Sequence, residues 1–165
     1  MQPIRMNTPA SLVEDRANVL FIDGNATNRQ TFASAFACDF DVRLAGSMEE
    51  AWEILAEGRT DVVICEQLLP GILGSDALGQ VKQRHPRAKR MLITEHADLR
   101  SLVDALNNAG VCHYISKPWE VDAVRTAVRD AHASLQAQDA QSALTSQLLE
   151  SNRQLEFALR QRLLS

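Results

Sequence analysis

The sequence has few cysteines and prolines and lacks any long apolar run. Cys38, Cys65 and Cys112 are widely spaced and form no CxxC pair, so they indicate reduced, buried thiols rather than a disulfide framework or a metal site. No segment approaches the roughly 20 apolar residues of a membrane span, and residues 1–15 lack the apolar centre of a signal peptide. We therefore expect a cytoplasmic protein without a membrane anchor.

The sequence is also expected to lack a cluster of positive charge. The net charge is −4, and we take Lys and Arg to be spread along the chain without a basic run. Binding to DNA or to anionic lipid depends on clustered cations, so neither is expected as the main partner. The hydrophobic fraction of 45% and the charged fraction of 23% are those of an ordinary globular domain.

Short apolar runs alternate with stretches of helical spacing from Asn18 onward. The runs cover residues 19–22, 41–45, 62–65, 91–93 and 111–115, and most of them are apolar on both faces, which suits a parallel sheet covered on both sides. Apolar residues at helical spacing follow each run; they include Phe32, Phe36, Trp52, Leu55, Leu78, Val81, Leu99, Val103, Leu106, Val124 and Val128. The pattern predicts a doubly wound α/β domain with a five-stranded parallel sheet, and Trp52 is interpreted as a core residue.

Polar residues with phosphate-handling chemistry come within two residues of the ends of four of these runs. Asp23 follows the first, Glu66 the third, Thr94 the fourth and Lys117 the fifth. Ligands of open α/β sheets bind beyond the carboxyl ends of the strands. We therefore expect two acids, a hydroxyl and a lysine to meet at one edge.

In this order and spacing the residues resemble the receiver domain of two-component response regulators. The resemblance covers residues 18 to about 134 and is carried by VLFID ending at Asp23, LLPGILG over residues 68–74, Thr94, and YISKPW over residues 114–119. It implies a flavodoxin-like receiver fold and a signalling protein with protein partners. It does not imply an enzymatic activity, and we assign no catalytic residue.

The resemblance also implies a role for each site residue. In that family an acidic pair after the first strand holds Mg²⁺, and an Asp ending the third strand accepts the phosphoryl group. Asp23 matches the first acid of the pair, and Thr94 and Lys117 match the residues that bind the phosphoryl oxygens. Tyr114 matches the aromatic residue whose rotamer follows the switch, and the bond before Pro118 resembles the family's cis peptide.

Three residues depart from the family pattern. Gly24 stands in place of the second acid and so removes a possible Mg²⁺ ligand. Glu66 stands in place of the acceptor Asp, and its longer side chain moves the carboxylate away from the in-line position. Glu95 adds a second negative charge near an incoming phosphate. We expect the site neither to accept phosphate in the usual way nor to retain Mg²⁺.

Several interpretations stay open at this stage. Glu66 is either a fixed mimic of the phosphorylated state, paired with Lys117 and Thr94, or the product of drift at an unused site. A working phospho-receiver is the alternative function: the Lys-Pro-Trp119 sequence resembles receivers joined to cyclic-di-GMP phosphodiesterase or diguanylate cyclase outputs, although Trp119 equally suits a place at the base of the last helix. A phosphatase-like hydrolase would need a nucleophilic Asp, for which Glu66 is a poor substitute.

The last part of the chain predicts a long helix. No Pro or Gly follows Val121, and Leu148, Asn152, Leu155 and Leu159 recur at 4-3-4 spacing. This spacing is typical of a parallel coiled coil, with Asn152 at a core position; a solvated linker helix is the alternative. We predict a leader over residues 1–17, a receiver-like domain over residues 18–134, and a helical extension over residues 135–165 that forms a homodimer.

Overall fold

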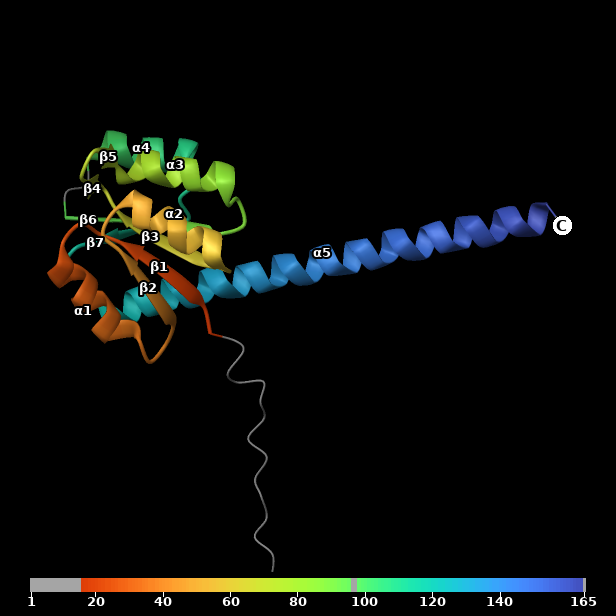
Figure 1. Cartoon of the computed structure of the whole chain (residues 1–165), viewed down its shortest axis with the longest axis horizontal. Helices are drawn as coiled ribbons and strands as arrows, with labels where there is room; N and C mark the ends of the chain where they lie inside the picture. The colour runs from red at the N-terminus through yellow and green to blue at the C-terminus, as the bar shows by residue number, and fades with distance from the viewer. Residues whose placement is uncertain (1–15, 96–97, 165) are drawn as a thin grey trace, which may run out of the picture. The chain divides into compact units, whose positions relative to one another are not determined.

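The computed structural model describes residues 16–95 and 98–164 (Figure 1). The predicted leader lies almost entirely outside these residues. The chain divides into two compact units, one ending at His132 and the other beginning at Ala133, and each is described by itself below.

The first unit is built on a sheet of five parallel strands. Its strands are β1 (Asn18–Ile22), β2 (Asp41–Ala45), β3 (Val62–Glu66), β6 (Lys89–Thr94) and β7 (His113–Ser116), in the order β2-β1-β3-β6-β7. The central strand β3 is buried along its whole length, as its continuous apolar sequence requires. The predicted doubly wound, flavodoxin-like fold is confirmed.

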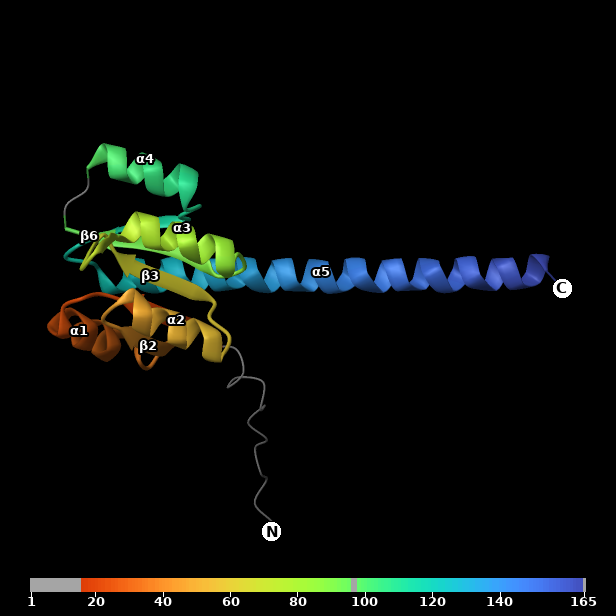
Figure 2. The same cartoon turned by 45° about the horizontal axis from the view of Figure 1, so that its top comes forward.

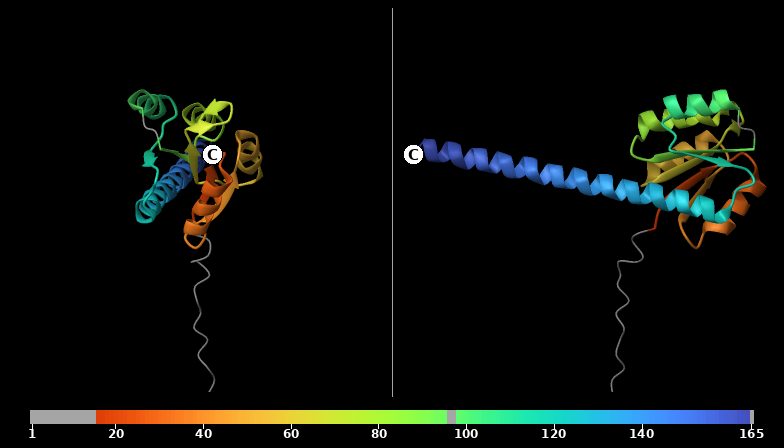
Figure 3. Two further views of the ribbon diagram at one scale, coloured as in Figure 1. Left: turned by 90° about the vertical axis from the view of Figure 1, so that its left-hand side faces the viewer. Right: turned by 180° about the vertical axis from the view of Figure 1, so that it is seen from behind.

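Helices cover both faces of this sheet, as the end-on view in Figure 3 shows. The helices are α1 (Ala26–Phe36), α2 (Met48–Glu57), α3 (Gly74–Arg84), α4 (Leu99–Asn108) and α5 (Val121–Leu163). Phe32 of α1 and Val128 of α5 bury their side chains with Phe21 on one face. Leu55 of α2 and Leu78 of α3 do so with Leu20 on the other, and Figure 2 shows α2 and α3 beside β3. Alternate residues of β1 therefore serve two separate cores.

Two segments differ from the expectation. A short antiparallel hairpin of β4 (Leu68–Leu69) and β5 (Ile72–Leu73) follows β3, and it turns at Gly71, whose φ of 80° suits a residue without a side chain. The last strand begins at His113, whereas the apolar run begins two residues earlier. Residues 111 and 112, the first two of that run, follow the turn at Gly110, where φ is 58°.

Helix α4 was correctly predicted from its apolar stripe, but the stripe does not face the core. Leu99, Val103 and Leu106 are 76%, 45% and 59% exposed. The buried residues are small: Ala105 of the helix and Ala109, which caps its end, lie in the core that α3 also covers. Small side chains let the helix approach closely, so the larger ones are left on the outer face. Trp52 is likewise only partly buried, at the edge of the core.

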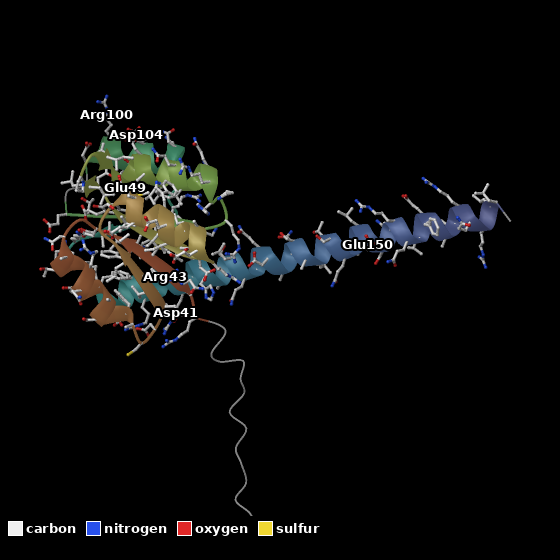
Figure 4. All side chains as sticks on the ribbon, viewed as in Figure 1. Asp41, Arg43, Glu49, Arg100, Asp104 and Glu150 are labelled. Carbon is white, nitrogen blue, oxygen red and sulfur yellow. The ribbon has the colours of Figure 1, made fainter. Side chains whose placement is uncertain are left out.

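The second unit is the C-terminal continuation of α5, which runs unbroken to Leu163. Residues 136–164 are all exposed. Figure 4 shows side chains that project above and below this helix, with Glu150 labelled among them. None of the described helices is both long enough and apolar enough to cross a membrane.

Candidate functional site

The carboxyl ends of the strands surround a cleft of about 550 Å³. It is lined by Asp23, Gly24, Asn25, Asn28, Glu66, Leu68, Leu69, Pro70, Thr94, Glu95 and Lys117. The six residues that the sequence assigned to a degenerate phosphorylation site are all on this lining. The structure therefore brings these strand ends together at one edge of the sheet.

Lys117 is the centre of the cleft. Its Nζ lies 2.8 Å from Asp23 Oδ2 and 2.5 Å from Glu66 Oε2. The side chains of Lys117, Asp23 and Glu66 are 8%, 4% and 9% exposed, so water screens these charges poorly. One buried ammonium thus forms ion pairs with the carboxylates at the ends of two neighbouring strands.

The Asp23 carboxylate is held on both oxygens. The backbone N–H of Asn25 donates to Oδ1 at 2.9 Å, while the side-chain amide of Asn28 donates to Oδ2 at 3.1 Å. Asn25 also caps α1 by accepting from the backbone N–H of Asn28. The start of α1 therefore fixes the first acid of the site. Asn28 was missed from the sequence; the available signal was Asn25, a residue type that favours a helix N-cap and so places residue 28 in the first turn.

Glu66 is held by the segment that follows it. Its Oε1 accepts a hydrogen bond from the backbone N–H of Leu68 at 3.3 Å. The first turn of α3 packs directly on its carbonyl: a Cβ added to Gly74 would lie 2.1 Å from Glu66 O. Gly74 is therefore required for α3 to begin this close to β3. The longer acidic side chain consequently has a defined position in the cleft.

Thr94, Tyr114 and Lys117 are joined through one carbonyl. Thr94 O accepts from the backbone N–H of Lys117 at 3.0 Å and from the Tyr114 hydroxyl at 3.4 Å. The bond between Lys117 and Pro118 is cis, as the resemblance implied. Tyr114 is half-buried against the core of α2, α3 and α4, so it lies between that core and the cleft.

The two remaining departures sit at the mouth of the cleft. Gly24 adopts an ordinary backbone conformation, and a Cβ there would meet Pro70 Cδ at 3.3 Å, so a side chain fits after a small adjustment. Glu95 is exposed at the end of β6. Neither residue is built into the packing, which makes both suitable for substitution.

The charges of the cleft shift two proton equilibria. Burial alone would lower the pKa of Lys117, but the hydrogen bonds and charges of Asp23 and Glu66 outweigh burial and hold that pKa above its ordinary value. Burial and the negative charge of Glu66 raise the pKa of Tyr114. Lys117 is therefore firmly protonated and Tyr114 firmly neutral at physiological pH.

The other residues singled out in the sequence, Trp119 and the three cysteines, lie outside the cleft lining. Trp119 packs edge-on against Phe21 and Phe32, with ring centroids 6.3 and 6.0 Å away, which agrees with its interpretation as a cover for the base of the last helix. Cys65 is buried, and burial raises its thiol pKa. Contrary to expectation, Cys38 and Cys112 are exposed.

A sheet of this order, with a lysine and two acids at its carboxyl edge, defines a receiver-type signalling domain. The chain belongs to the response regulator receiver domain family, whose model matches residues 19–129. Receiver domains are regulatory and interact with proteins such as kinases and output domains.

The relatives include transcriptional regulators. The chain is 30% identical to the hydrogenase transcriptional regulatory protein HoxA of Cupriavidus necator over 118 residues, which cover 72% of this chain and 24% of HoxA. It is 35% identical to the DNA-binding transcriptional regulator NtrC of Escherichia coli over 89 residues, or 54% of this chain and 19% of NtrC. The match thus spans a quarter or less of each relative.

A solved structure with the same fold is the signal receiver domain of an HD domain-containing protein from Pseudomonas fluorescens. It is 26% identical to this chain, covers 74% of it and 98% of its own length, and superimposes with a TM-score of 0.71. The likeness is to the receiver domain of that protein.

The residues of the cleft are a poor fit for the Mg²⁺ that the family implies. Mg²⁺ requires several oxygen ligands in octahedral geometry. Here residue 24 has no side chain to act as a ligand. The carboxylates of Asp23 and Glu66 are both paired with the ammonium of Lys117. The described residues contain no group of three or more His, Cys, Asp or Glu side chains arranged to hold a metal ion.

Proposed function

We propose that this chain is a degenerate receiver, which is not phosphorylated in the usual way and acts through protein–protein contacts. The observation that carries the proposal is the position of Lys117 between Asp23 and Glu66, at 2.8 and 2.5 Å. The carboxylate at the acceptor position is already paired with the lysine that would otherwise bind the phosphoryl oxygens. A phosphoryl group would have to displace this buried ion pair, without a second acid at residue 24 to help hold Mg²⁺.

The same ion pair supports the interpretation of Glu66 as a fixed mimic of the phosphorylated state. Its carboxylate projects into the cleft and contacts Lys117, while the carbonyl of Thr94 links Lys117 to Tyr114. Protein partners would then bind one permanent arrangement of the surface around Tyr114. Drift at an unused site predicts instead that Glu66→Gln leaves partner binding and oligomeric state unchanged.

Incubation with acetyl phosphate and Mg²⁺ tests the phosphorylation chemistry. We expect the intact mass of the natural protein to stay unchanged. A variant carrying Gly24→Asp, Glu66→Asp and Glu95→Ala should gain the mass of one phosphoryl group, because the three departures are reversed while Thr94 and Lys117 are kept.

A matched variant and a folding check sharpen this test. The variant that carries Glu66→Asn together with Gly24→Asp and Glu95→Ala should form no adduct, which locates the adduct of the restored variant at the acceptor position. Circular dichroism verifies that each variant is folded. A stoichiometric adduct on the natural protein would overturn the proposal and establish the alternative: a working phospho-receiver that controls an output domain of the cyclic-di-GMP type or another class. The complete set Asp23, Thr94 and Lys117 in the cleft is the observation that favours this alternative.

We further propose that residues 135–165 form a helical extension through which the receiver-like domain of residues 18–134 dimerises, with residues 1–17 as a leader. Leu148, Leu155 and Leu159 are 59%, 62% and 61% exposed on the helix, at the spacing that a two-stranded coiled coil buries. An isolated helix of this kind is marginally stable in water. A second copy of the chain would cover the leucines and pair the two Asn152 side chains.

Light scattering on the full chain tests dimerisation. The natural protein should have the mass of a dimer, and Leu155→Asp should convert it to a monomer, because two buried carboxylates would face each other across the seam. Gln154→Asp is the matched control, since it adds the same charge at the neighbouring position outside the seam and should remain dimeric. A monomeric natural chain would contradict the proposal.

A further inference from the structure

Positive charge is concentrated in two segments, which corrects the expectation that Lys and Arg are spread along the chain. Residues 77–94 contain five Lys or Arg residues and no Asp or Glu, and residues 153–162 contain three Arg residues. The first segment uses cations within the fold, such as Arg90, which donates from Nε to the carbonyl of Ala109 at 2.7 Å. The second segment lies on the exposed extension of α5, beyond Glu150 (Figure 4), so its charges face water.

Two leucines of this extension lie outside the proposed coiled-coil seam. Leu149 and Leu163 are 56% and 85% exposed, and they follow the seam residues Leu148 and Leu159 by one and four positions. The positions that flank the seam of a two-stranded coiled coil are often charged, because such a seam needs apolar residues only at its core positions. A dimer formed through the seam would therefore leave both leucines at its edge, in contact with water.

Three charged residues lie between these leucines on the same side of the helix. Leu149, Arg153, Glu156, Arg160 and Leu163 recur at 4-3-4-3 spacing, so they form one line along the helix, which we call the side stripe. The side chains of its three charged residues are exposed, and none of them forms an ion pair with another described residue. These charges are therefore unpaired on a single helix.

The side stripe has the same order of residue types in both directions: Leu, Arg, Glu, Arg, Leu. A second copy that packs against it in antiparallel orientation, centred on Glu156, would place its Leu163 against Leu149. Each Glu156 would then lie within one turn of Arg153 and Arg160 of the other copy, which stand three and four positions from its own counterpart. A parallel copy in register would instead place each charge beside one of the same sign. The stripe is therefore complementary to itself in the antiparallel orientation.

We propose that the side stripe is a second self-association surface of this chain, through which coiled-coil dimers join in antiparallel orientation. The same surface serves both partners of such a contact, and the alternating charges at its centre determine the orientation. Each helix contributes two leucines to the stripe and three to the seam, so we expect dimers to form first and to join as the concentration rises. The inference rests on the proposed dimerisation, which has its own test above.

Sedimentation equilibrium of the full chain over a range of protein concentrations tests the side stripe. The natural protein should have the mass of a dimer at the lowest concentration, and its average mass should rise above the dimer as the concentration increases. Leu149→Gln and Leu163→Gln should each weaken the association between dimers about tenfold, because each removes a leucine from the contact. Both variants should remain dimeric, which also verifies that they are folded.

Phe157→Gln is the matched control for the two leucines. Phe157 is 65% exposed and directly follows Glu156, so its side chain points roughly 100° away from the centre of the stripe around the helix. This variant should associate as the natural protein does. A loss equal to that of Leu149→Gln would show that any apolar residue of the extension serves, and it would overturn the assignment to the stripe.

An exchange of charges tests whether the stripes contact each other directly. Glu156→Arg makes the centre of the stripe entirely basic, and Arg153→Glu together with Arg160→Glu makes it entirely acidic. Each of these variants alone should remain a dimer at every concentration, because like charges oppose each other. An equal mixture of the two should associate beyond the dimer, since a basic stripe then faces an acidic one.

The outcomes separate this inference from the proposed dimerisation. A natural chain that stays dimeric at every concentration would overturn the inference and leave the dimerisation proposal intact, whereas a monomeric chain would overturn both. Association that neither leucine substitution weakens would place the contact elsewhere and make the inference wrong. It would also be wrong if the two charge variants associated no more strongly together than each does alone.

Discussion

Replacing Asp61 with alanine is expected to lower the free energy of unfolding by about 1–3 kcal/mol. Asp61 is 1% exposed and precedes β3. Its carboxylate accepts hydrogen bonds from Asn18, Arg59 and Arg87. Removing it leaves the buried N–H of Asn18 and two guanidinium groups without their shared partner, and a buried donor that loses its acceptor costs its full desolvation energy.

The stabilisation that Asp61 provides should decrease as the pH falls. Burial alone would raise the pKa of Asp61, but the hydrogen bonds from Asn18, Arg59 and Arg87 outweigh it and hold that pKa below its ordinary value. The stabilisation is therefore fully present above the unfolded pKa, near 4, and is lost as the pH falls through the lower folded pKa. Urea unfolding at pH 7 should separate natural and variant proteins clearly, and the gap should narrow below about pH 4.

Asp41→Ala provides the matched control for Asp61. Asp41, at the start of β2 (Figure 4), has a side chain that is 58% exposed and lies 3.8 Å from Arg16. Exposed ion pairs of this kind contribute about 0–1 kcal/mol. A loss below 1 kcal/mol for Asp61→Ala, equal to that of the control, would show that the buried network contributes little to the fold.

Periodicity was sufficient to predict the sheet. Strands that are buried on both faces, such as β3, have continuous apolar sequences that water-exposed segments cannot carry. The same reasoning failed at α4, where Leu99 and Leu106 are exposed while Ala105 is buried. A stripe of large apolar residues indicates a helix, but it does not tell whether the core or a partner is to cover it.

The site was predictable wherever its chemistry stands at the end of a strand. Asp23, Glu66 and Lys117 meet because parallel strands end at one edge. Asn28, in the cleft, and Asp61, at the opposite edge of the sheet, were missed for different reasons. The side chain of Asn28 reaches Asp23 only once α1 has formed, and Asp61 stands before its strand rather than after it, where partners come from the sequence-distant Asn18, Arg87 and His132.

Lys117→Met should have a larger effect than Asp61→Ala and lower the free energy of unfolding by about 3–5 kcal/mol, because it leaves buried charges without a partner. Methionine retains most of the volume of the side chain but none of its charge. Asp23 and Glu66, whose side chains are 4% and 9% exposed, would then face each other as two like charges in a poorly hydrated cleft. Urea unfolding at pH 7 measures the loss.

A second substitution assigns this loss to Glu66. In the Lys117→Met background, Glu66→Gln should recover at least about 1 kcal/mol, since it removes one of the two opposed charges. In the natural background the same change should destabilise, because there the carboxylate is paired with Lys117 at 2.5 Å. The change of sign is the signature of direct coupling between the two side chains. Equal effects of Glu66→Gln in both backgrounds would mean that Lys117 and Glu66 do not hold each other, and the interpretation of Glu66 as a built-in substitute for phosphate would lose its physical basis.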